Sequence, residues 1–112
     1  MSSKTLSQMF GATFILVGLL GFVPNPVVSA DGIFVVNGMH NLVHVLTGSA
    51  FLASGLFFPG SERRTIQVIG VAYVGVSIIG FLTSGNTLLG LIAINQADRW
   101  LHLGLALAIL TA

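Results

Sequence analysis

Four apolar stretches of similar length divide the chain, and polar or proline-containing segments separate them. The stretches cover roughly Leu6–Val23, Met39–Phe58, Thr65–Leu82 and Ala97–Ala112. Each is about 16–20 residues long, close to the ~20 residues that an α-helix needs to cross a hydrocarbon core of ~30 Å. Because backbone groups in lipid must be hydrogen-bonded within the chain, these stretches are expected to be helices.

Charged residues are too few to cover the surface of a water-soluble domain. They make up 6% of the chain, against 54% hydrophobic residues, whereas soluble proteins average about 25% charged residues. The sequence therefore predicts an all-α membrane protein with four transmembrane helices, forming a single domain over residues 1–112. The net charge of +1 gives no reason to expect nucleic acid as a partner. The absence of cysteine excludes disulfides, thiolate metal ligands and thiol nucleophiles.

An internal duplication relates the two halves of the chain. Residues 11–22, GATFILVGLLGF, align with residues 70–81, GVAYVGVSIIGF, and residues 37–44, NGMHNLVH, align with residues 95–102, NQADRWLH. Each half is one helix pair, about 6–58 and about 65–112. Since each repeat contains two helices, both repeats should cross the membrane in the same sense, related by a pseudo-two-fold axis along the membrane normal.

The basic residues predict the orientation. Lys4, Arg63 and Arg64 lie at the N-terminus and in the central loop, whereas the opposite face has only Arg99. The positive-inside rule then places both termini of this multi-pass protein in the cytoplasm. Residues 1–30 also fit a signal-peptide pattern, but their counterpart in the second repeat favours a retained span.

The asparagine–histidine segments resemble those of a bacterial four-helix membrane family, DUF4383-like, which is catalogued as a domain of unknown function. The similar features are NGxHNxVHxxxG at 37–48, NxxDxWLH at 95–102 and the glycine-rich first and third stretches. Ala106 departs from the first repeat, which has glycine at that point. The resemblance implies four helices in a bacterial cell membrane or internal membrane, and it implies no activity.

Polar groups inside the apolar stretches are the candidate functional residues, because ionisable side chains are costly in lipid. His40 and His44 lie four residues apart on one helix face, and Asp98 and His102 lie four apart on the equivalent face of the last helix. The pseudo-two-fold axis should bring these faces together near the outer membrane surface.

Three interpretations of this His/Asp cluster remain open. In a structural role, Asn37 and Asn95 cap their helices, Asp98 favours the positive helix end, and the histidines form hydrogen bonds between helices. As a metal site, the three imidazoles and one carboxylate would suit zinc. As a tetrapyrrole site, His44 or His102 would bind haem or chlorophyll axially.

Small residues on the helix faces predict close helix packing, within the chain or against a partner. The glycines concerned are Gly11, Gly18, Gly21, Gly48, Gly70, Gly75, Gly80 and Gly104. Tyr73 lies in the middle of a span and needs a hydrogen-bond partner if it is buried.

No nucleophile–base pair, phosphate-binding loop or long lid segment is visible, so an enzyme is not expected. The function expected is that of a non-catalytic accessory or structural subunit in the lipid bilayer, packing against itself as a homo-oligomer or against a larger membrane complex. The alternative is a metal- or tetrapyrrole-binding membrane protein that uses the His/Asp cluster.

Overall fold

Four helices account for most of the chain in the computed structural model, which describes residues 1–112. They are α1 (Ser3–Leu20), α2 (Gly38–Phe57), α3 (Glu62–Leu82) and α4 (Gln96–Thr111). Their bounds closely follow the four apolar stretches. The prediction of a helical protein with four helices is therefore confirmed.

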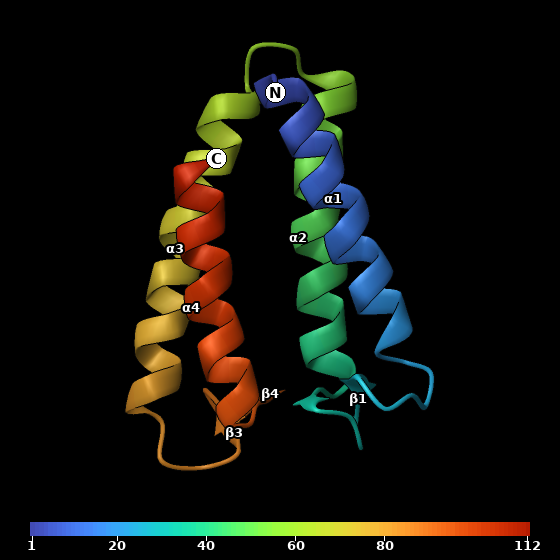
Figure 1. Cartoon of the computed structure of the whole chain (residues 1–112), viewed down its shortest axis with the longest axis vertical. Helices are drawn as coiled ribbons and strands as arrows, with labels where there is room; N and C mark the ends of the chain where they lie inside the picture. Colours follow the sequence, from blue (N-terminus) through green and yellow to red (C-terminus); the bar gives the residue numbers. More distant parts are fainter.

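The helices are arranged as two pairs that run in the same sense. α1 packs along α2, and α3 packs along α4, whereas contacts between the pairs are sparser. Figure 1 shows that α1 and α3 run in one direction and that α2 and α4 run in the other. Both termini and the α2–α3 connection therefore lie at one end of the molecule. The connections within the pairs lie at the other end, which we call the loop end.

The loop end contains two short β ladders. β1 (Val28–Ser29) pairs with β2 (Phe34–Val35) in parallel, and β3 (Thr87–Leu88) pairs with β4 (Ile92–Ala93) in antiparallel fashion. The sequence predicted only polar loops here, because two-residue strands have no readable periodicity. The first connection has one residue more between its strands than the second (30–33 against 89–91), and the two ladders differ in direction.

The core lies where the two pairs meet, and aromatic rings dominate it. Phe14 on α1 is central, with ring centroids 5.8 Å from Phe51 on α2 and 5.5 Å from Tyr73 on α3. All three side chains are almost fully buried. They join the helix pairs directly beneath the polar residues described below.

Glycines bring α1 and α2 into close contact. A Cβ at Gly48 would lie 2.7 Å from the carbonyl oxygen of Gly11, and one at Gly18 would lie 2.9 Å from that of Asn41. A Cβ at Gly21 would overlap the Asn41 side chain. These backbones can approach one another so closely only because the side chains are missing.

Glycines of the second pair are less crowded. A Cβ at Gly70 would lie 2.7 Å from the Leu110 side chain, whereas at Gly80 the nearest atoms are 3.8 Å away. No heavy atom lies within 4 Å of a Cβ placed at Gly75 or Gly104. The missing side chains of these last two glycines therefore do not face another helix of this chain.

Arg99 closes the C-terminal end of α3. Its guanidinium donates hydrogen bonds to the carbonyl oxygens of Gly80 and Gly85 at 2.8 Å and of Thr83 at 3.1 Å. Carbonyls at a helix end have no partner within the helix. Arg99, the one basic residue near the loop end, is thus engaged in hydrogen bonds at the C-terminal end of α3.

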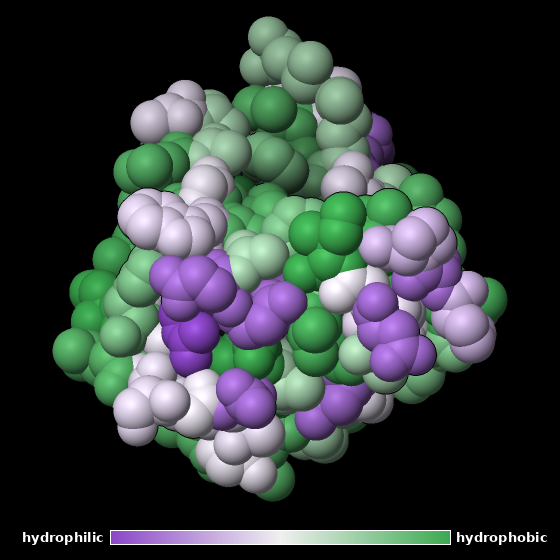
Figure 2. Space-filling model, turned by 60° about the horizontal axis from the view of Figure 1, so that its bottom comes forward, coloured by the Kyte–Doolittle hydropathy of each residue, from purple (hydrophilic) through white to green (hydrophobic).

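Two of the helices are long and apolar enough to cross a membrane. α1 has a mean hydropathy of 1.2 and α3 one of 2.0. α4 has only 16 residues, and the first turns of α2 contain two histidines and an asparagine. Figure 2, which brings the loop end forward, shows hydrophilic residues gathered at that end and hydrophobic residues around its margin.

Candidate functional site

Equivalent asparagines begin α2 and α4. The Asn37 side-chain oxygen accepts a hydrogen bond from the backbone N–H of His40 at 2.9 Å, and Asn95 accepts one from Asp98 at 2.9 Å. Asparagine suits this position because its oxygen replaces a missing intrahelical acceptor.

The amide groups of the same asparagines reach across to the other half. Asn37 Nδ2 donates to the carbonyl oxygen of Leu91 at 3.0 Å, and Asn95 Nδ2 donates to that of Ile33 at 2.8 Å. Leu91 and Ile33 occupy equivalent places in the two connections. The pair of bonds is therefore reciprocal, as a pseudo-two-fold axis requires, and it fixes the first turns of α2 and α4 relative to each other.

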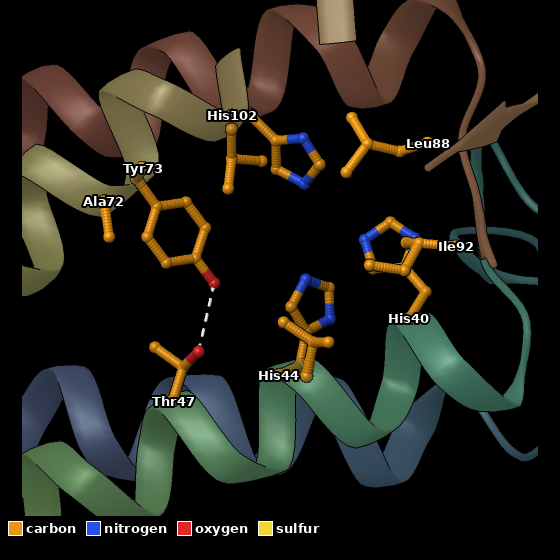
Figure 3. Close-up of a pocket in the computed structure, with 10 residues that line it drawn as sticks. His40, His44, Thr47, Ala72, Tyr73, Leu88, Ile92 and His102 are labelled. Atoms are coloured by element: carbon orange, nitrogen blue, oxygen red, sulfur yellow. Dashed lines mark hydrogen bonds between the residues drawn. The ribbon is translucent and has the colours of Figure 1, made fainter. Parts of the chain in front are cut away.

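Three histidines converge between these helices. His40 and His44 come from α2, and His102 comes from α4 (Figure 3). One ring nitrogen of each lies within 4.8 Å of the corresponding nitrogens of the others. The three side chains are only 2–4% exposed. We call these three residues the histidine triad.

The hydrogen bonds of the triad leave ring nitrogens free. His40 Nδ1 lies 2.6 Å from the carbonyl oxygen of Ala93 in β4. Because a carbonyl only accepts, Nδ1 must carry the proton, and Nε2 of His40 has a free lone pair. His44 Nδ1 is buried without any hydrogen-bond partner. Asn41 Oδ1, on the same helix, is the other buried side-chain atom without a partner, although buried polar atoms almost always have one.

Asp98 is not part of the converging set. Its carboxylate accepts a hydrogen bond from the backbone N–H of Asn95 at 3.0 Å, which completes a reciprocal capping box at the start of α4. The structure thus brings together three of the four candidate ligands and places the fourth at a helix terminus.

A cavity of about 170 Å³ opens beside the triad. Tyr73 on α3 donates a hydrogen bond across it to the Thr47 hydroxyl on α2 at 3.3 Å (Figure 3). Sequence analysis identified Tyr73 only as a residue in need of a partner, and it missed Thr47. The difference between the repeats, tyrosine at 73 against phenylalanine at 14, was the available signal. Most of the lining is apolar, but we call this the polar cavity because the histidine triad, Thr47 and Tyr73 place polar groups on it. Its lining residues are His40, Val43, His44, Thr47, Ala72, Tyr73, Val76, Leu88, Ile92 and His102.

A second cavity of about 190 Å³ occupies the position related by the duplication. It lies between α1, α2 and α4, and it is lined by Thr13, Phe14, Val17, His44, Leu101 and Leu105. In the repeat alignment these residues correspond to Ala72, Tyr73, Val76, His102, Val43 and Thr47 of the polar cavity. The two cavities therefore share their architecture but differ in chemistry, since the second is almost entirely apolar.

The geometry restricts which cofactor the triad could hold. Each cavity is smaller than the ~300–1,000 Å³ of typical sites for cofactor-sized ligands. All three imidazoles also point into the bundle, away from its outer surface. A single metal ion fits this arrangement, because three imidazoles are common ligands of Zn²⁺ and related divalent ions.

Comparisons with known proteins identify the family but no activity. No curated protein and no solved structure matches the chain. The family model described as domain of unknown function DUF4383 matches residues 4–112, which include both helix pairs and the complete triad. The chain therefore belongs to the DUF4383 family.

Proposed function

We propose that this chain is a small integral membrane protein that binds a divalent transition-metal ion, of which Zn²⁺ is the best fit, through His40, His44 and His102. The observation that carries the proposal is the convergence of three buried imidazoles, one of which has an unpartnered nitrogen. Coordination through Nδ1 of His44 would satisfy that nitrogen and would offset the cost of burying the group.

Only a small rearrangement is needed to bind the ion. Tetrahedral Zn–N bonds of 2.0–2.1 Å place the ligand nitrogens about 3.4 Å from one another. The triad nitrogens lie within 4.8 Å of one another, so rotations of the imidazoles would bring them into range. The hydrogen bond from His40 to Ala93 already orients one ligand, as outer-shell partners do in known metal sites.

The ion would join the two helix pairs. His40 and His44 belong to the first pair and His102 belongs to the second, whereas direct contacts between the pairs are sparse. A ligand that binds only the folded state stabilises it by about 2.7 kcal/mol at a free concentration of 100 times its Kd. Chelation should therefore lower the melting temperature of the protein.

Metal analysis of the purified protein tests the proposal. The protein, extracted in detergent and loaded with Zn²⁺, should retain about one ion per chain after dialysis. His44→Ala and His102→Ala should each lose the ion, and helical circular dichroism should show that both variants still fold. Retention of stoichiometric zinc by both variants would overturn the assignment.

Asp98→Asn supplies the matched control. Asparagine still offers an oxygen to the N–H of Asn95, so the helix start is largely preserved. This variant should bind zinc as the unaltered protein does, because Asp98 lies outside the triad. Loss of zinc from Asp98→Asn alone would point to a different ligand set.

Membrane insertion of all four helices, with both termini in the cytoplasm, belongs to the same proposal. Every helix directs large apolar side chains outward, such as Leu16, Leu46, Val68 and Leu107, each 57–66% exposed. Lys4 and Arg64 are at the end that carries the termini, and Arg99 at the other end is occupied by helix α3. This distribution agrees with the positive-inside rule.

A second candidate function is that of an accessory subunit, and the open glycines favour it. Gly75 and Gly104 lie among outward apolar residues, and a Cβ placed at either would meet no atom of another helix within 4 Å. Such surfaces suit close packing against another membrane helix, either from a second copy or from a larger complex. Gly75→Leu should then reduce the size of the detergent-solubilised assembly. An unchanged assembly in both Gly75→Leu and Gly104→Leu would count against this role.

A further inference from the structure

We propose that the metal ion keeps one coordination position open towards the polar cavity, and that a small anion binds there. This inference rests on the proposed metal site and specifies the class of ligand that the metal ion would bind. Three protein ligands with a free fourth position are the arrangement found in zinc sites that bind exogenous ligands, whereas structural zinc sites are closed by four protein ligands.

The charge balance of the site favours an anion. Neutral imidazoles leave both positive charges of a divalent ion uncompensated. The chain has three carboxylate side chains, and none of them lines the cavity. Asp98 serves the α4 cap, Glu62 accepts a hydrogen bond from Gly60 at the opposite end, and Asp31 is exposed in a connection. A charge buried in a low-dielectric site is costly unless it is paired.

The cavity also supplies a hydrogen-bond donor. The side chains of Thr13, Thr83 and Thr111 donate to the carbonyl four residues earlier. Thr47 makes no such bond; its hydroxyl oxygen instead accepts the Tyr73 proton, which leaves the proton of Thr47 free for a ligand. A volume of about 170 Å³ has room for several waters or a small anion.

Comparison of the two cavities indicates the side from which the anion binds. Both cavities border His44, but only the polar one also borders His40 and His102. The apolar cavity has phenylalanine and leucine at the positions of Tyr73 and Thr47. An anion entering that side would lose its hydration without gaining a donor.

Cobalt substitution followed by azide titration tests the inference. Co²⁺ in a four-coordinate site with nitrogen ligands gives visible absorption bands, and these bands change when an anion replaces a bound water. Saturable spectral changes on addition of sodium azide would support the open position. If Co²⁺ fails to bind stoichiometrically, the proposed metal site itself fails. If Co²⁺ binds and azide leaves the spectrum unchanged, only the open position is refuted.

Two variants at equivalent positions of the cavities locate the anion. Val76→Phe fills part of the polar cavity, and Val17→Phe makes the same change in the apolar cavity. Val76→Phe should weaken azide binding at least ten-fold without removing Co²⁺, whereas Val17→Phe should leave azide binding unchanged. The opposite pattern would overturn the assignment to the polar cavity.

A finer substitution tests the hydrogen-bond donor. Thr47→Val keeps the shape of the side chain and removes its hydroxyl. It should weaken azide binding about five-fold, as expected for one hydrogen bond, while Thr13→Val in the other cavity should have no effect. Equal azide affinity in Thr47→Val and the unaltered protein would show that the hydroxyl does not contact the anion.

Discussion

Asn37 and Asn95 each perform two separable tasks. The side-chain oxygen caps a helix, and the side-chain nitrogen binds a carbonyl of the other half. The sequence predicted the first task because N-capping depends on local spacing. It could not predict the second, because the partners are Leu91 and Ile33, far away along the chain.

Substitution of Asn37 separates the two tasks. Asn37→Ala removes both and should lower the free energy of unfolding by about 2 kcal/mol, about 1 for the cap and about 1 for the bond to Leu91. Asn37→Asp keeps the capping oxygen and loses only the donor, so it should cost about half as much. Denaturant titration in detergent measures both. Equal losses in the two variants would show that the bond between the halves contributes nothing.

The histidine triad illustrates what local spacing can and cannot say about a site. The duplication and the i, i+4 spacing predicted that His40, His44 and His102 would meet, and the structure brings them together. The same reasoning groups Asp98 with them, because Asp98 is the counterpart of His40 in the repeat alignment. Its position also suits a capping box, and in the structure its carboxylate accepts a hydrogen bond from the backbone N–H of Asn95.

At the scale of helices, glycine positions divide into two kinds that sequence alone does not distinguish. A glycine allows close packing only if another helix lies opposite its missing Cβ. Gly48 meets that condition and Gly104 does not. The sequence predicted packing at both, because it shows the spacing of small residues but not which face is covered.

Alanine substitutions at these two glycines should act in opposite directions. Gly48→Ala would place a Cβ 2.7 Å from the carbonyl oxygen of Gly11, which forces α1 and α2 apart and should cost about 1–3 kcal/mol. Gly104→Ala meets no atom and should stabilise α4 by up to about 1 kcal/mol through helix propensity. Melting temperatures of the two variants check this. A stabilising Gly48→Ala would refute the close packing.

The positions of the helices are the most predictable part of the fold, because the length and apolar character of each stretch determine them. The β ladders at the loop end were not predictable, since two residues per strand leave no pattern. The hydrogen bonds that fix these connections also come from residues of the other repeat, which no local pattern reveals.

At the scale of the whole molecule, the orientation is open to labelling in intact cells. Pro59 and Ser84 are exposed at opposite ends of the bundle. With both termini in the cytoplasm, Ser84→Cys should react with an impermeant thiol reagent and Pro59→Cys should not. The chain has no other cysteine, so the background is clean. Labelling of Pro59→Cys with protection of Ser84→Cys would reverse the proposed topology.

The pair of related cavities has a consequence for how such a site can arise. A symmetric dimer of identical helix pairs necessarily has the same cavity on both sides of its axis. Joining two pairs in one chain removes that constraint, because each copy can then change independently. Tyrosine and threonine could appear on one side while phenylalanine and leucine occupied the other. Covalent linkage thus allows a bundle with pseudo-two-fold symmetry to have a polar cavity on one side only.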